Sequence, residues 1–98
     1  MTQALILVDI QKDYFPGGDM ELVGMESAAG KAAELLARFR ETGQPRFHVR
    51  HEFEDPAAPF FKPGSAGAVI HDVVAPAAGE TVITKHQEIG RASWRVRV

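Results

Sequence analysis

The stretch that decides the fold is ALILVDIQKDY, residues 4–14, in which five apolar residues lead directly into Asp9. A continuous apolar run that includes β-branched residues is typical of a strand buried on both faces of a parallel sheet. In open α/β sheets, the carboxyl ends of such strands border the ligand site. We therefore predict a buried strand at 4–8 and take Asp9 as the first candidate site residue.

A second strand-like run, residues 81–84, ends at Lys85 within ETVITKH. If both runs are parallel strands, their polar ends lie at the same edge of one sheet. The sequence therefore predicts a site in which the carboxylate of Asp9 faces the ammonium of Lys85.

Composition restricts the range of functions. The chain has 98 residues, of which 45% are hydrophobic and 24% charged, as expected for one small globular domain. A net charge of -2 without a basic run argues against binding to nucleic acid or to an anionic membrane surface. No apolar stretch is long enough to cross a bilayer, so we expect a cytoplasmic protein. Because cysteine is absent, the chain itself contains no disulfide, no thiolate metal site and no thiol nucleophile.

The segment after the first strand is predicted to be a loop followed by a helix. FPGGD, residues 15–19, combines proline with two glycines, which is typical of a turn. Residues 26–42 are rich in alanine and leucine, with apolar side chains spaced for one helical face and Gly43 positioned to end the helix. The apolar face consists of Ala29, Ala32, Ala33, Leu36 and Phe39.

The rest of the chain completes a β-α-β-loop-β order. A short strand is predicted at 45–51, followed by a proline-rich loop over 52–79 in which 66–73 could form a short helix. The strand at 81–84 then extends a parallel sheet with right-handed crossovers.

The last eleven residues, EIGRASWRVRV (88–98), do not fit this order. They resemble the translation of a common sequencing-library adapter, EIGRASCRERV. We therefore expect a partial domain over 1–87 and a non-native tail over 88–98. Without the tail the chain has 8 basic and 12 acidic residues, a net charge of -4. The alternative is a genuine basic strand.

The motif LILVDIQKDYFPGGDMEL, continued by FHVRHEFEDPAAPFFKPGSAGAVIHDVVAPAAGETVITKH, resembles the isochorismatase-like cysteine hydrolases. This superfamily includes isochorismatases, nicotinamidases and N-carbamoylsarcosine amidohydrolases. The resemblance implies the N-terminal half of a three-layer α/β/α, Rossmann-like parallel sheet, truncated after its third strand. It also implies a catalytic triad in which Asp9 and Lys85 match the aspartate and the lysine.

The third member of that triad is a cysteine that this chain lacks. A thiol attacks a carbonyl efficiently only as thiolate, so it needs a proton acceptor and a nearby cation. In the family the aspartate accepts the proton and the lysine supplies the cation. The resemblance therefore implies hydrolysis of amide, imide or related bonds of a small molecule, and we expect the chain alone to be inactive.

Two further residues match family positions beside the catalytic aspartate or along the substrate pocket: Gln11 and Tyr14. Tyr14 could equally be a packing aromatic. Phe60 and Phe61 could cap a pocket, although packing within the loop is the simpler interpretation of both.

No cofactor and no metal are expected. Nicotinamidases bind a metal through an Asp-x-His pattern after the second strand, whereas this chain has RHEFED there, with His51 near the place of the aspartate. This favours the metal-free branches of the family. The four histidines, His48, His51, His71 and His86, are then surface or hydrogen-bonded residues.

Three other interpretations compete with the hydrolase. A dehalogenase-type phosphatase needs a second carboxylate two residues after Asp9, where this chain has Gln11. A receiver-like signalling or binding module would need an acidic pair that Gln3 and Ala4 do not provide. The chain could also be an inert fragment.

The family strand order, 3-2-1-4-5-6, would leave the first strand of this fragment as an unpaired edge, so we predict poor solubility. The resemblance also implies that the full-length protein forms homo-oligomers. Substrate identity depends on pocket residues in both halves of the family fold.

Overall fold

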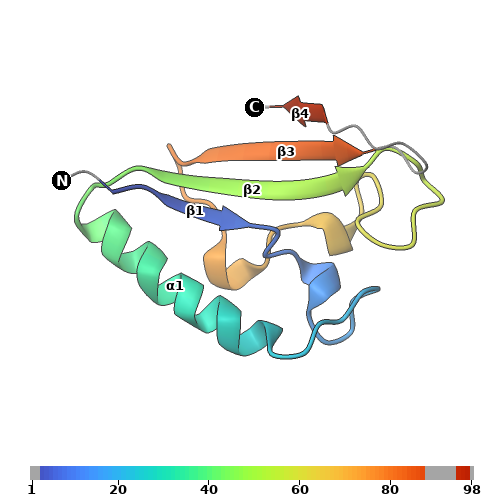
Figure 1. The fold of residues 1–98 in the computed structure, drawn as a ribbon, viewed down its shortest axis with the longest axis horizontal. Helices are drawn as coiled ribbons and strands as arrows, with labels where there is room; N and C mark the ends of the chain where they lie inside the picture. The colour runs from blue at the N-terminus through green and yellow to red at the C-terminus, as the bar shows by residue number, and fades with distance from the viewer. Residues whose placement is uncertain (1–2, 88–94, 98) are drawn as a thin grey trace.

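A parallel sheet forms the centre of the computed structural model, which describes residues 3–87 and 95–97 (Figure 1). Its strands are β1 (Leu5–Val8), β2 (Arg46–Phe53), β3 (Thr81–Gln87) and β4 (Arg95–Arg97), in the order β1-β2-β3-β4. The first three strands are parallel, and β4 pairs antiparallel with β3. The predicted α/β fold with a parallel sheet is therefore confirmed. Of the predicted tail, residues 88–94 and 98 lie outside the described residues.

Helix α1 (Met25–Glu41) lies along one face of the sheet and matches the prediction to within one residue at each end (Figure 1). Its predicted apolar face is the buried one: Leu36 packs with Leu7, Ile70 and Val74 in the hydrophobic core. The helix ends at Glu41, and Gly43, two residues later, has a positive φ of 67° that glycine readily adopts. Among the described residues, no helix combines the length and apolarity needed to cross a bilayer.

The long connection between β2 and β3 differs from the prediction. Instead of one helix over 66–73, it contains two 3-10 turns, η2 (Ala66–Ala68) and η3 (Asp72–Val74). The residues between them are extended because they pair with the chain that follows β1. Val69 O accepts a hydrogen bond from Lys12 N at 3.0 Å, and His71 N donates to Ile10 O at 2.8 Å. These tertiary hydrogen bonds replace those of a helix.

Strands β2 and β3 are both longer than predicted, because they pair with each other from Phe47 opposite Thr81 to Phe53 opposite Gln87. Lys85 consequently lies within β3 and not after its end. In this register it stands opposite His51. The polar side chains of the site are therefore carried by strand residues as well as by loops.

The two faces of β1 are covered differently. Leu7 is buried against the α1 side, whereas Ile6 is 59% exposed and Val8 51% exposed on the opposite face. Of the three layers implied by the family resemblance, the described residues form the sheet and one covering layer. β1 is the outermost strand of the described sheet and pairs with β2 alone among the described strands (Figure 1).

An ionic cluster joins α1 to the starts of β2 and β3. The carboxylate of Glu80 accepts hydrogen bonds from Arg40 Nε at 2.7 Å and from Arg46 Nε at 3.0 Å. Its other oxygen lies 2.8 Å from His48 Nε2. The side chain of Glu80 is only 1% exposed, so these partners replace the water that a buried carboxylate loses.

Candidate active site

Asp9 follows the last residue of β1 and has an unusual backbone conformation. Its φ is 57°, in the left-handed region that residues with a Cβ rarely adopt. The backbone N–H of Asp9 donates to Val49 O at 2.8 Å, which fixes this conformation to β2. The strand thus ends in a sharp change of direction that presents the carboxylate at the sheet edge.

Lys85 and Asp9 are brought together by the strand order. Lys85 Nζ lies 3.5 Å from Asp9 Oδ2, and both side chains are about one quarter exposed, at 25% and 26%. The second carboxylate oxygen, Oδ1, is buried and has no hydrogen-bond partner within residues 3–87 and 95–97. The pair therefore combines an ionic contact with an acceptor oxygen that can take another proton or donor.

Gln11 lies inside the framework around Asp9. It is fully buried, its Nε2 donates to His51 O and to Ala68 O at 2.7 Å each, and its Oε1 accepts from His51 N at 2.8 Å. These bonds use both amide hydrogens and join the segment that follows β1 to β2 and η2 at one point. The structure thus assigns Gln11 a bracing role, and its predicted contact with a substrate stays a prediction.

Tyr14 lies at the end of the 3-10 turn η1 (Lys12–Tyr14) and is partly exposed. Burial raises the pKa of its phenol, and the negative charge of Asp9 raises it further. The phenol is therefore protonated at neutral pH and lies within the electrostatic reach of Asp9.

His51 stands beside Lys85 on β2. Burial lowers the pKa of its imidazole; Asp9 acts in the opposite direction, and Lys85 and His86 lower the pKa further. The ring is therefore neutral at pH 7, so Lys85 supplies the positive charge at this point.

Aromatic rings continue from His51 along one side of the site. The ring centroid of His51 lies 4.5 Å from that of Phe53 and 6.0 Å from that of Phe61. Phe61 in turn lies 4.8 Å from Tyr14 and 5.0 Å from Phe60. We call Tyr14, Phe53, Phe60 and Phe61 the aromatic wall.

The histidines are distributed over separate environments. His48 contacts Glu80, His71 stacks on Phe15 with a centroid distance of 4.0 Å, and His86 Nδ1 lies 3.0 Å from Glu52 O. In the part of the chain that the structure describes, no group of three or more His, Asp or Glu residues is arranged to hold a metal ion.

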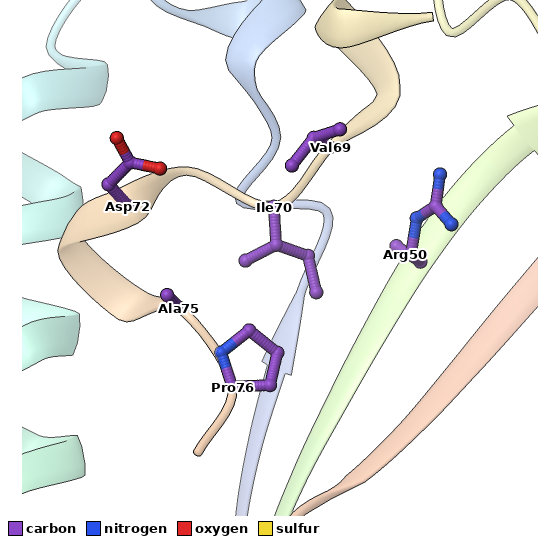
Figure 2. Close-up of a pocket in the computed structure, with 6 residues that line it drawn as sticks. All are labelled: Arg50, Val69, Ile70, Asp72, Ala75 and Pro76. Carbon is purple, nitrogen blue, oxygen red and sulfur yellow. The ribbon is translucent and has the colours of Figure 1, made fainter. Parts of the chain in front are cut away.

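A separate apolar groove of about 290 Å³ lies between β2 and the η2–η3 connection (Figure 2). It is lined by Arg50, Val69, Ile70, Asp72, Ala75 and Pro76. None of the four predicted site residues lines it. Arg50 at its border already donates to Ala68 O and to Glu52 Oε2.

Sequence reasoning missed two buried carboxylates, Asp13 and Glu80. Asp13 lies in the quoted motif, but an acidic residue beside a glycine-rich loop looks like an ordinary loop residue. Glu80 directly precedes an apolar run, and only its proximity to Arg40 and Arg46 in the fold shows that it is buried. No local pattern in the sequence indicated either role.

Comparison with known proteins gives one consistent family. The sequence model of the isochorismatase domain matches residues 3–90. The chain is 54% identical over 86 residues to the isochorismatase family protein YddQ of Bacillus subtilis, a match that covers 88% of this chain and 48% of the relative.

Solved structures agree with this match. A crystal structure from Oleispira antarctica, described as an isochorismatase hydrolase, is 55% identical with a TM-score of 0.84, covering 88% of this chain and 47% of that one. N-carbamoylsarcosine amidase of Thermoplasma acidophilum is 26% identical with a TM-score of 0.77, covering 88% and 53%. The chain spans about half the length of these relatives.

Proposed function

The chain belongs to the isochorismatase family, and from that membership we propose that Asp9 and Lys85 are two of the three catalytic groups of a cysteine hydrolase. Its substrate would be a small molecule with an amide, an imide or a related bond. The observation that carries the proposal is the 3.5 Å contact between Lys85 Nζ and Asp9 Oδ2 at the sheet edge. Catalytic groups from different strands commonly meet at this edge of an α/β fold.

The proposed chemistry begins with a thiol from outside this chain, because the chain contains no cysteine. Asp9 accepts the thiol proton, and the ammonium of Lys85 stabilises the resulting thiolate. The sulfur attacks the carbonyl carbon, the C–N bond breaks, and the protonated Asp9 carboxyl gives its proton to the leaving nitrogen. Asp9 then accepts a proton from water as the hydroxide attacks the thioester, and the proton returns to sulfur.

Two features of the site support this sequence of proton transfers. Asp9 keeps Oδ1 available as an acceptor while Oδ2 contacts Lys85. Neutral His51 adds no second positive charge beside Lys85. Without a thiol, the 98-residue chain alone is proposed to be inactive.

A chimera tests the proposal. The segment of the Oleispira antarctica hydrolase that matches this chain is replaced by residues 3–87, and release of ammonia or amine is measured on a panel of amides and N-carbamoyl compounds. We expect the chimera to cleave the compounds that the parent cleaves, and Asp9→Asn and Lys85→Met each to reduce kcat at least about 100-fold.

Asp55→Asn is the matched control, because the Asp55 carboxylate accepts from Ala57 N in an exposed turn. A chimera that folds but cleaves nothing the active parent cleaves would contradict the proposal. So would an Asp9→Asn chimera with the kcat of the unmodified chimera. In that case the non-catalytic binding module becomes the better interpretation.

A further inference from the structure

Asp13 is a buried carboxylate that the proposed chemistry does not use. It is 4% exposed and lies in η1, four residues after Asp9. Oδ1 accepts a hydrogen bond from Asp19 N at 3.1 Å, and Oδ2 accepts one from Phe61 N at 2.6 Å. A carboxylate removed from water is stable only when such donors replace its hydration. Both of its oxygens are therefore committed to backbone N–H groups.

The bond to Phe61 joins segments 48 residues apart and holds an unusual conformation. Phe61 has a φ of 48°, in the left-handed region, and its side chain is buried. Its carbonyl also accepts a hydrogen bond from Phe53 N at 2.9 Å. A residue with a Cβ remains in this region only where the surrounding structure fixes it. Asp13 and Phe53 fix Phe61 from both sides.

Two glycines provide the space for Asp13. A Cβ on Gly67 would overlap the Asp13 carboxylate, and a Cβ on Gly18 would overlap the Asp13 backbone. Asp13 is thus enclosed by the FPGGD loop and by η2. Its carboxylate can hardly move without displacing one of these segments.

Phe61 also contacts residues that lie near Asp9 and Lys85. Its ring packs on Tyr14 and Phe60, and His51 is within 6.0 Å. His51 stands opposite Lys85 in the β2–β3 register, and Lys85 Nζ lies 3.5 Å from Asp9 Oδ2. Phe61 is therefore connected to the Asp9–Lys85 pair through its neighbour His51.

We propose that Asp13 is a positioning residue: its carboxylate holds Phe61 in the left-handed conformation and so sets the aromatic wall beside Asp9. This inference rests on the proposed function in one respect: it takes the site beside the aromatic wall to be the catalytic site. Both oxygens of Asp13 accept from backbone N–H groups, so Asp13 does not act on the substrate or the reacting atoms directly. It acts through the rings of the wall.

The first test is the Asp13→Asn variant of the 98-residue chain. Asp19 N and Phe61 N donate to different oxygens of Asp13, and asparagine replaces one of these oxygens with an NH2 group, so one of the two donors would face another donor. Tyr14 is the chain's single tyrosine, so tyrosinate absorbance reports on the wall directly. We expect Asp13→Asn to lower the pKa of Tyr14 toward 10.0, its ordinary value, as its contact with Phe61 loosens.

Gly67→Ala is the second variant, because the added methyl group displaces the carboxylate without removing its charge. It should lower the pKa of Tyr14 in the same direction. Asp55→Asn, which removes a carboxylate from an exposed turn, should leave the pKa unchanged. A folded Asp13→Asn chain with the wild-type tyrosine titration would overturn the proposal.

The wild-type chain provides a measurement that does not depend on the folding of a variant. The amide proton of Phe61 should resonate downfield of loop amides and exchange with solvent at least about tenfold more slowly, since it is donated to a buried carboxylate. Rapid exchange at Phe61 would overturn the proposal. Neither measurement requires catalysis, so an inactive chimera would count against the proposed function and not against this role of Asp13.

Discussion

Asp9 and Phe61 are the two non-glycine residues with positive φ among those the structure describes, and both belong to the candidate site. Each has its backbone N–H bonded across the fold, Asp9 to Val49 O and Phe61 to Asp13 Oδ2. Strained backbone of this kind costs about 1–3 kcal/mol per residue and accumulates at functional sites. The site is therefore built from residues held in place by tertiary hydrogen bonds and not by local preference.

The interaction between Asp9 and Tyr14 can be tested through the pKa of the phenol. Asp9→Asn removes the negative charge that helps to raise the pKa of the phenol, so that pKa should fall. It should remain above 10.0, because burial, the larger cause, is unchanged. Tyrosinate absorbance as a function of pH measures it. An unchanged titration would contradict an electrostatic interaction between the two groups.

Gln11 gives a prediction for stability. Gln11→Leu removes the acceptor of His51 N and the donor to His51 O in a buried position, while Ala68 O keeps its hydrogen bonds from Arg50. We expect a loss of roughly 2–4 kcal/mol in the free energy of unfolding, measured by urea denaturation. Gln44→Leu is the control, since Gln44 is partly exposed and its side-chain amide donates to the Thr42 hydroxyl at the surface; it should change stability by less than about 0.5 kcal/mol. Equal effects of the two variants would contradict the bracing role of Gln11.

Among the elements, those with a strong periodic signal were predictable from the sequence. The apolar run at β1 and the alanine- and leucine-rich face of α1 gave their positions closely, because both patterns are contained in the local sequence. The connection over 66–74 was not, because its backbone bonds to Ile10 and Lys12, far away in sequence. The contact between Asp9 and Lys85 could be predicted, because both residues follow strand-like runs of the sequence. The hydrogen bond between Asp13 and Phe61 could not, because it joins two loop segments that are 48 residues apart.

The cluster around Glu80 predicts how the contact between α1, β2 and β3 depends on pH. The hydrogen bonds from Arg40, with those from Ala77 N and His48, hold the pKa of Glu80 well below its ordinary value of 4.5. The folded state therefore prefers the ionised carboxylate. Its stabilising contribution is complete above pH 4.5 and is lost progressively as the pH falls below that value.

We expect Glu80→Gln to destabilise the chain by about 2–4 kcal/mol at pH 7, because Arg40, Arg46 and His48 lose a buried anion. The difference from wild type should shrink as the pH is lowered from 5 to 3. Urea denaturation at several pH values measures it, with exposed Glu41→Gln as the control. A difference that is constant with pH would contradict the ionic account.

The sheet has one covered face and one face on which apolar side chains are exposed. Ile6 and Val8 are both more than half exposed, and β1 is the edge strand of the described sheet. An uncovered apolar face next to an open strand edge favours pairing with another chain. The chain also spans about half the length of its relatives.

We therefore expect the 98-residue chain to associate as its concentration rises, and the double variant Ile6→Thr, Val8→Thr to associate at least about tenfold less strongly, because it removes apolar area from that face. Sedimentation velocity over a concentration series measures the change. Val23→Thr is the matched control: Val23 is fully exposed in the loop before α1, away from the sheet, and its replacement should leave association unchanged. A wild-type chain that stays monomeric throughout the series, and unfolds in one reversible transition, would show that this face needs no cover and that three parallel strands with one helix layer already form a self-sufficient fold.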